Sequence, residues 1–222
     1  MDRRFVWLLT LALVAVACGK KQVRVQPPPQ AARPVAPAPA GLTERGIASW
    51  YGKPYDGRPA ADGEIYNMET MVAAHRTLPF QTRVQVRNLT NGKTVEVRIV
   101  DRGPFVGSRL IDLSHAAARA IDMIGSGTAP VELTVLGGPA PVGKAYFAVQ
   151  VGAFREKSNA ERLEHSLAAK YGAAKSVLRG GDPPLWHVLA GQEPSVEAAE
   201  NLAKRLREEQ KVPSAFVVRL DP

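Results

Sequence analysis

The segment RVQVRNLTNGKTVEVRIVD, residues 83–101, decides the fold class of the first half of the chain. Valine or isoleucine alternates with polar residues in two runs, at positions 84 and 86 within residues 83–89 and at 95, 97 and 99 within residues 94–100. A period of two buries one side of each run and leaves the other side in water, which predicts two strands. The dipeptide Asn91-Gly92 between them is typical of a hairpin turn. The segment therefore predicts an antiparallel pair in a mainly β domain.

Residues 46–138 are expected to form that domain. Residues 131–135 alternate in the same way as the two runs of the hairpin. Ser114 precedes an alanine-rich stretch, which predicts a short helix with Ser114 as its N-cap. Many short strands separated by turn residues predict a small closed barrel.

Residues 145–222 are expected to form a second domain with a different order of elements, after a linker at 139–144. Strands are predicted at 145–154, 174–178, 185–190 and 215–219. Ser158 with Glu161 has the pattern of a capping box, and Ser195 precedes a second amphipathic run. The predicted order is β-α-β-β-α-β, the split βαβ arrangement, in an α+β domain. Its antiparallel sheet has both helices on one face and leaves the other face open.

The first 18 residues are similar to an export signal. Arg3 and Arg4 precede an apolar run at 5–17, which is shorter than the roughly 20 residues that a membrane-spanning helix needs. Cys18 is the single cysteine, and the sequence AVAC that ends at it resembles a bacterial lipobox. This resemblance implies cleavage before Cys18, lipidation of Cys18 and stable membrane anchoring. The alternative is a buried N-terminal helix.

Residues 19–45 are expected to be a tether. Six of the 13 residues from Pro27 to Pro39 are proline, which predicts an extended, semi-rigid spacer of about 3 Å per residue. Such a spacer would hold the next domain away from the membrane. By analogy with lipoprotein sorting, Gly19 after Cys18 implies the outer membrane.

The net charge of +8 is concentrated in the leader and tether. Residues 1–45 contain seven basic and two acidic residues, whereas 46–138 contain ten and nine, and 145–222 contain eleven and ten. Two nearly neutral domains do not support a nucleic-acid interface, and no RNA-binding aromatic motif is present. Basic residues in the tether fit a position near anionic headgroups.

Three ionisable residues could form an acid–base site, although each has an ordinary explanation. Asp101 precedes a tight turn and could accept backbone hydrogen bonds there. Glu64 could be a solvated loop carboxylate, and His75 a buried structural histidine. Brought together, they could transfer protons. The four histidines lack paired ligand spacing, so neither a metal nor a cofactor is expected.

The motifs of this region resemble the rare lipoprotein A (RlpA) family. They are SWYG (49–52), GRP and GE within 57–64, AAHRTLPF (73–80), VDRGPF (100–105) and RLIDLSHAAA (109–118). The resemblance implies a six-stranded double-psi β-barrel and catalytic roles for Glu64, His75 and Asp101. Ala60-Ala61 departs from the family pattern, which more often has threonine and a small residue there.

The resemblance also implies a reaction. Lytic transglycosylases of this family cleave the β-1,4 bond between N-acetylmuramic acid and N-acetylglucosamine and leave a 1,6-anhydro end. Asp101 is expected to be the acid and base, with Glu64 and His75 tuning it and holding the sugar. Trp50 and Tyr51 could stack on sugar rings or fill the barrel.

The second domain resembles the SPOR family through FAVQVGAF (147–154) and NAERL (159–163). This implies binding of glycan strands stripped of stem peptides, a septal location and possible divisome partners. Gln150 is expected on the open face, because Val149 and Val151 point the other way. One of Trp186 and His187 faces outward as a further binding residue, and strand parity alone does not decide which.

Two functions therefore remain open. One is a lipid-anchored lytic transglycosylase that faces the periplasm. The other is a non-catalytic, expansin-like lipoprotein that binds peptidoglycan through the same groove.

Overall fold

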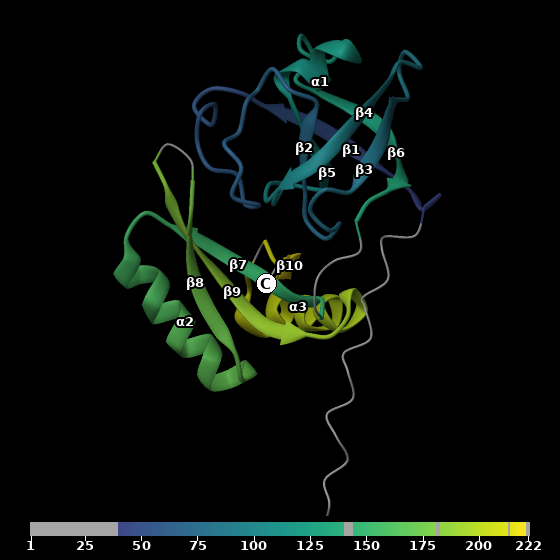
Figure 1. Ribbon diagram of the computed structural model, residues 1–222. Helices are drawn as coiled ribbons and strands as arrows, with labels where there is room; N and C mark the ends of the chain where they lie inside the picture. The colour runs from purple at the N-terminus through teal and green to yellow at the C-terminus, as the bar shows by residue number, and fades with distance from the viewer. Residues whose placement is uncertain (1–39, 140–143, 181–182, 213, 221–222) are drawn as a thin grey trace, which may run out of the picture. The chain divides into compact units, whose positions relative to one another are not determined.

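The computed structural model describes residues 40–139, 144–180, 183–212 and 214–220 (Figure 1). The expected export signal, Cys18 and residues 19–39 of the expected tether lie outside the described residues. The described part contains a β-barrel and a smaller α/β domain, which are considered separately below. None of its helices combines the length and apolar character needed to cross a membrane.

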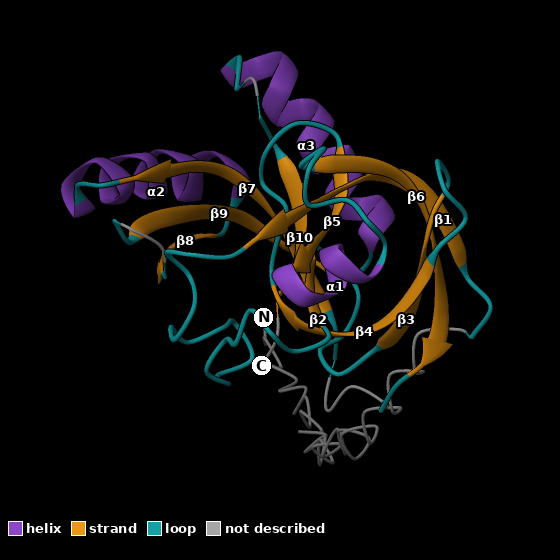
Figure 2. Cartoon of the chain, turned by 90° about the horizontal axis from the view of Figure 1, so that it is seen from above, coloured by secondary structure: helices purple, strands orange, loops and turns teal. Residues whose placement is uncertain are grey.

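The barrel is a closed ring of six strands in the order β1-β5-β2-β4-β3-β6, which can be followed in Figure 2. Two neighbouring pairs, β1 with β5 and β2 with β4, are parallel, and the other pairs are antiparallel. The first strand begins three residues before the expected boundary at residue 46. The strands are β1 (Thr43–Tyr51), β2 (Val72–His75), β3 (Arg83–Asn88), β4 (Thr94–Asp101), β5 (Arg109–Ser114) and β6 (Thr128–Gly137).

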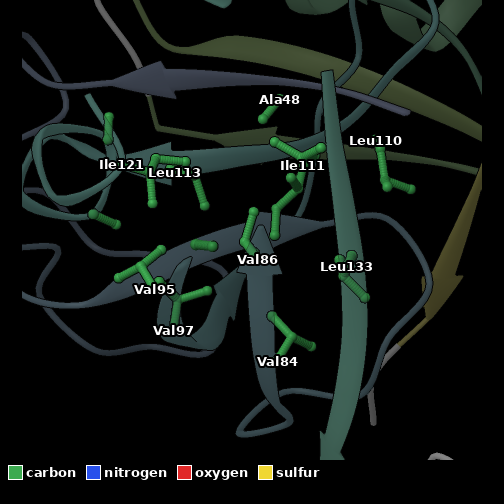
Figure 3. Close-up of a cluster of buried hydrophobic side chains, with 14 of the residues drawn as sticks. Ala48, Val84, Val86, Val95, Val97, Leu110, Ile111, Leu113, Ile121 and Leu133 are labelled. Atoms are coloured by element: carbon green, nitrogen blue, oxygen red, sulfur yellow. The ribbon is translucent and has the colours of Figure 1, made fainter. Parts of the chain in front are cut away.

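The alternating residues of the hairpin fill the barrel interior. Val84 pairs with Val97 and Val86 pairs with Val95, and all four are buried. Figure 3 shows these side chains meeting those of the other strands in one apolar cluster. Burying each such side chain contributes about 1.5–3 kcal/mol. This core confirms the predicted strands and packs the strands of the barrel against one another.

The short helix α1 (His115–Ala120) begins where the sequence predicts. The Ser114 hydroxyl accepts a 3.2 Å hydrogen bond from the Ala117 backbone N–H and donates one of 2.6 Å to the Thr70 carbonyl. The cap therefore also ties the long connection between β1 and β2 to the barrel.

The second domain confirms the predicted order of elements. Its sheet has the order β10-β7-β9-β8, all antiparallel. Apolar side chains from the sheet pack with those of the two helices in one core. The elements are β7 (Tyr146–Phe154), α2 (Lys157–Tyr171), β8 (Ala174–Arg179), β9 (Leu185–Glu193), α3 (Val196–Gln210) and β10 (Phe216–Leu220).

The two helix starts compare differently with expectation. Ser195 caps α3, because its hydroxyl accepts a 3.1 Å hydrogen bond from the Ala198 N–H. The predicted capping box at Ser158 is wrong. The N-cap of α2 is Glu156, whose backbone is extended, so the helix starts at Lys157 and Ser158 lies within its first turn.

Candidate functional site

A row of side chains crosses four neighbouring strands on the outer side of the barrel wall. In the register of the sheet, Ser49 on β1 lies opposite Asp112 on β5, Asp112 lies opposite Ala74 on β2, and Ala74 lies opposite Asp101 on β4. Directly opposed residues point to the same side of a sheet. The two carboxylates therefore share one side, about 10 Å apart at the backbone given two strand spacings. Ala74 occupies the strand position between them.

A β-bulge aims Asp101 at this row. Ala73 pairs with Ile99 and Ala74 pairs with Asp101, so Val100 is an extra residue in β4. In a regular strand Asp101 would point the same way as Ile99, which is fully buried in the core. The bulge reverses that parity and places the carboxylate outside.

The environment of Asp101 favours a protonated carboxyl. Burial raises its pKa, and two backbone hydrogen bonds partly offset this effect. Both hydrogen bonds reach the same oxygen: Oδ1 accepts from the Ala61 N–H at 3.1 Å and from the Arg102 N–H at 2.8 Å. Neither of these two backbone donors contacts Oδ2, the oxygen that would carry a proton.

Asp112 is a second carboxylate, which the sequence interpretation did not select. The Ser49 hydroxyl donates a short hydrogen bond to its Oδ1, and Arg109 Nη2 lies 3.7 Å from its Oδ2. Burial raises the pKa of Asp112, whereas Ser49 and Arg109 lower it. The signal was present in the sequence, because Asp112 alternates with Ile111 and Leu113, which are both fully buried.

Tyr51 stands two residues beyond Ser49 and points to the same side as the row. Its ring stacks on Tyr66 at 4.3 Å between centroids and meets the edge of Tyr55 at 6.0 Å. The Tyr66 hydroxyl donates a 2.6 Å hydrogen bond to the Tyr51 carbonyl. Burial raises the pKa of Tyr51, and the negative charge of Asp101 raises it further. Its hydroxyl therefore stays protonated and can donate a hydrogen bond.

Trp50 belongs to the barrel interior. It is partly buried against the main core cluster, and its ring lies 5.4 Å from that of His115. Of the two aromatic residues expected to stack on sugar, Tyr51 adjoins the row of carboxylates and Trp50 packs on the opposite side.

His75 also faces away from the carboxylates. It follows Ala74 directly and pairs with the core residue Ile111, so its ring points inward. Its Nδ1 accepts hydrogen bonds from the Thr77 and Leu78 N–H groups, at 3.2 and 3.1 Å. Burial, with the charges of Arg76 and Arg102, lowers the pKa of His75 to about 3. His75 was expected to tune Asp101 and hold the sugar; in the structure its ring is neutral and accepts the hydrogen bonds of a turn.

Glu64 is bound by an arginine. Its Oε1 and Oε2 accept hydrogen bonds from Arg98 Nη1 and Nη2, both at 2.8 Å, and Gln81 Nε2 donates to Oε1 at 3.2 Å. The hydrogen bonds from Arg98 lower the pKa of Glu64, which is therefore ionised. Glu64 lies in the loop that supplies the Ala61 N–H to Asp101, but its carboxylate is directed to Arg98.

In the second domain, Gln150 and His187 lie together on the face of the sheet opposite the helices. Gln150 Oε1 and His187 Nδ1 are 2.9 Å apart. Trp186 packs with the core on the helix side, and Lys157 Nζ lies 5.4 Å from the centroid of its ring. The structure thus resolves the open parity: His187 joins Gln150, and Trp186 does not.

Within the described ranges, no three His, Cys, Asp or Glu side chains gather closely enough to hold a metal ion.

Two family models match the chain, one over each domain. Residues 43–133 match a model described as lytic transglycolase, and residues 143–219 match the SPOR domain. Several curated proteins that are similar in sequence to this chain have the same name. The protein named endolytic peptidoglycan transglycosylase RlpA of Campylobacter jejuni is 43% identical over 156 residues, which cover 59% of this chain and 55% of that protein.

This chain is similar to the proteins named RlpA over most of its length. The protein of the same name from Helicobacter pylori strain J99 is 39% identical over 189 residues, covering 72% of this chain and 60% of that protein. The Vibrio cholerae RlpA is 52% identical over 98 residues, covering 44% and 37%. The chain thus spans little more than half the length of the first two relatives.

Among solved structures, an expansin of Clavibacter michiganensis is 24% identical, with a TM-score of 0.36, and covers 50% of this chain and 58% of that one. The fold of the chain is established by its own closed ring of strands and by the two family models.

Proposed function

We propose that this chain is an endolytic lytic transglycosylase of peptidoglycan. It would cleave the β-1,4 bond between N-acetylmuramic acid and N-acetylglucosamine in glycan strands and leave 1,6-anhydro ends, in cell-wall remodelling and division. The environment of Asp101 is the observation that carries the proposal. Burial raises the pKa of its carboxyl, a bulge turns the side chain out of the core, and two backbone N–H groups bind its Oδ1. The match of residues 43–133 to the lytic transglycolase model supports it.

Asp101 would act twice. Its proton, carried on Oδ2, passes to the glycosidic oxygen as the bond from C1 to that oxygen breaks. The C6 hydroxyl of the muramic acid then attacks C1 and returns its proton to the Asp101 carboxylate. The acid is regenerated and no water is consumed. A carboxyl with a pKa raised by burial can serve in both steps near neutral pH.

Asp112 and Tyr51 would assist from either side of this step. Positive charge develops at C1 as the bond breaks, and an ionised carboxylate nearby lowers the energy of that state. Burial raises the pKa of Asp112, and the Ser49 hydrogen bond and Arg109 oppose this effect by favouring the ionised form. Tyr51, with its protonated hydroxyl and a ring set by Tyr66 and Tyr55, would contact the sugar.

The second domain would select the substrate. Gln150 and His187 form a polar pair on the helix-free face of the sheet, and the SPOR match supports binding of peptide-stripped glycan there. Trp186, packed on the helix side, would support the fold of the domain and not bind glycan directly.

The location of the protein follows from the sequence interpretation. We infer a lipid anchor at Cys18, in the outer membrane and facing the periplasm, with the proline-rich tether reaching toward the wall. Enrichment at the septum and contact with divisome proteins complete this proposal.

The decisive test uses the purified full-length chain and glycan strands from which an amidase has removed the peptides. Products are separated by chromatography and identified by mass spectrometry. Anhydro-ended fragments of intermediate length support endolytic cleavage. Binding without such products, under conditions in which a known lytic transglycosylase is active, would instead establish the non-catalytic wall-binding lipoprotein.

A further inference from the structure

We propose that Glu64 is a positioning residue: with Arg98 and Gln81 it braces the loop 60–64, and this brace holds the Ala61 N–H on Asp101. The inference rests on the proposed function for its kinetic consequences. Its structural part concerns only how one side of the Asp101 carboxyl is held.

The brace is a closed set of hydrogen bonds between the loop and two neighbouring segments of the barrel. Arg98 binds both carboxylate oxygens of Glu64, and Arg98 Nη1 also donates to Gln81 Oε1 at 2.7 Å. Gln81 Nε2 donates to Glu64 Oε1 and, at 3.0 Å, to Asp62 Oδ2. A bidentate arginine–carboxylate pair fixes orientation as well as distance. Both ends of the loop tip are therefore held by residues of the barrel.

The loop tip in turn reaches Asp101. The Asp62 N–H donates to the Val100 carbonyl at 3.1 Å, and the preceding N–H, that of Ala61, donates to Asp101 Oδ1. The Asp62 side chain also accepts from the Glu64 N–H at 3.0 Å, which closes the turn. A displacement of residues 62–64 would therefore move the Ala61 N–H relative to the carboxyl that it contacts.

Gln81 has a left-handed backbone conformation, and its side-chain amide binds both Asp62 and Glu64. Its φ is +67°, in the left-handed region where non-glycine residues are uncommon. Its N–H donates to the Ile99 carbonyl at 2.8 Å, which fixes this residue to β4 close to Arg98. The strained backbone aims the side-chain amide at the two loop carboxylates, and strain of this kind persists where the surroundings fix it.

A direct chemical role for Glu64 fits the geometry less well. An acid catalyst must carry a proton, yet both oxygens of Glu64 accept hydrogen bonds from a guanidinium. Half of the Glu64 side chain is exposed, whereas Asp62 is only 5% exposed within the same cluster. The carboxylate of Glu64 is thus engaged by the protein, and its influence on Asp101 passes through the loop backbone.

The test compares Glu64→Gln, Arg98→Gln and the double variant in the full-length chain. The assay uses peptide-stripped glycan, and the pKa of the Asp101 carboxyl is followed by ¹³C NMR titration. Glu96→Gln is the matched control. Glu96 lies on β4, as Arg98 does, and the change removes its exposed ion pair with Arg83 without touching the loop.

We expect each single variant to lower kcat about tenfold, the effect of losing one hydrogen bond to a charged group, with KM unchanged. The double variant should be no worse than either single one, because all three break the same brace. Losing the Ala61 N–H should raise the pKa of Asp101 by about one unit and move the alkaline limit of activity upward by the same amount. Glu96→Gln should match the wild type.

Three results would overturn the brace. In the first, Glu64→Gln abolishes activity while Arg98→Gln stays near normal. In the second, the single effects multiply in the double variant, and in the third, the pKa of Asp101 is unchanged in folded variants. If Arg98→Gln fails to fold, Gln81→Asn tests the same point, because asparagine tolerates a positive φ but its shorter amide does not span the two carboxylates. Absence of anhydro products from the wild type would refute the proposed function alone, since the NMR titration needs no activity.

Discussion

Asp101 and Asp112 lie on strands that do not pair with each other, yet both are opposed to Ala74 and face the same side of the barrel wall. The short side chain of Ala74 occupies the strand position between the two carboxylates. Their surroundings differ: Asp101 is held by backbone N–H groups on one oxygen, whereas Asp112 is held by Ser49 and Arg109. Two carboxylates in different environments suit two different roles.

Replacement of Asp101 by asparagine tests the acid. The amide keeps the shape of the side chain but cannot donate and recover a proton, so we expect kcat to fall by about 10²–10⁴-fold. Mass spectrometry of glycan digests measures the anhydro ends. Binding to peptide-stripped glycan should persist, because the second domain is unchanged. Undiminished turnover would show that Asp101 is not the acid.

Replacement of Ser49 by alanine tests the role of Asp112. Without the hydroxyl, the ionised form of Asp112 loses a hydrogen bond and its pKa rises. Because activity needs ionised Asp112, the acidic limit of the pH–rate profile should move to higher pH. The alkaline limit, which reports Asp101, should stay in place. A profile that shifts at neither limit would contradict a charged role for Asp112.

His75 should contribute to stability and not to chemistry. Its folded pKa of about 3 lies below the unfolded value of about 6.5, so its contribution is complete above pH 6.5 and is lost as the pH falls toward 3. The loss amounts to about 1.4 kcal/mol per pH unit.

This contribution is measured as the free energy of unfolding in urea, with hydrogen exchange of the barrel strands as the readout. Between pH 6.5 and 5.5 the wild type should lose about 1 kcal/mol more than His75→Gln, because the full slope is reached only below the unfolded pKa. At pH 7 the variant should turn over glycan at the wild-type rate per folded molecule. A large loss of kcat in folded His75→Gln would restore a catalytic role for this residue.

Variants in the second domain should separate binding from folding. Gln150→Ala removes half of a polar pair on the helix-free face, and we expect about tenfold weaker binding of peptide-stripped glycan, since one hydrogen bond is worth about 1 kcal/mol or more. Trp186→Ala removes packing against the core and should destabilise the domain by about 2 kcal/mol or more without changing Kd. Calorimetric titration and thermal unfolding distinguish the two effects. The reverse pattern would place the glycan on the helix side.

Much of the fold could be predicted from local patterns. Period-two alternation identified the hairpin strands, because a strand that buries one side has an apolar residue at every second position. Ser114 and Ser195 were correctly predicted as caps, since the contact that each makes lies three residues away. Ser158 failed as a cap because α2 starts at Lys157, one residue before it.

The site was less predictable, because its contacts join distant segments. The parity of β4 alone puts Asp101 on the same side as Ile99, and only the pairing of β4 with β2 reveals the bulge that reverses it. Asp112 was not selected from the sequence, because its place beside Ala74 depends on the pairing of β5 with β2. Glu64 was expected to act on Asp101 through its charge, but Arg98, 34 residues away in sequence, binds its carboxylate.

The sequence by itself determined the elements and the two-domain order, and its motifs supplied the prediction that Asp101 is the acid, because alternation, caps and motifs are local properties of the chain. Only the tertiary structure decided which side chains share a face: Asp112 with Asp101, Gln150 with His187, and His75 and Trp50 turned inward. The physical reason is register. A strand's neighbours and its bulges determine the direction of each side chain, and neither is set by the strand's own residues.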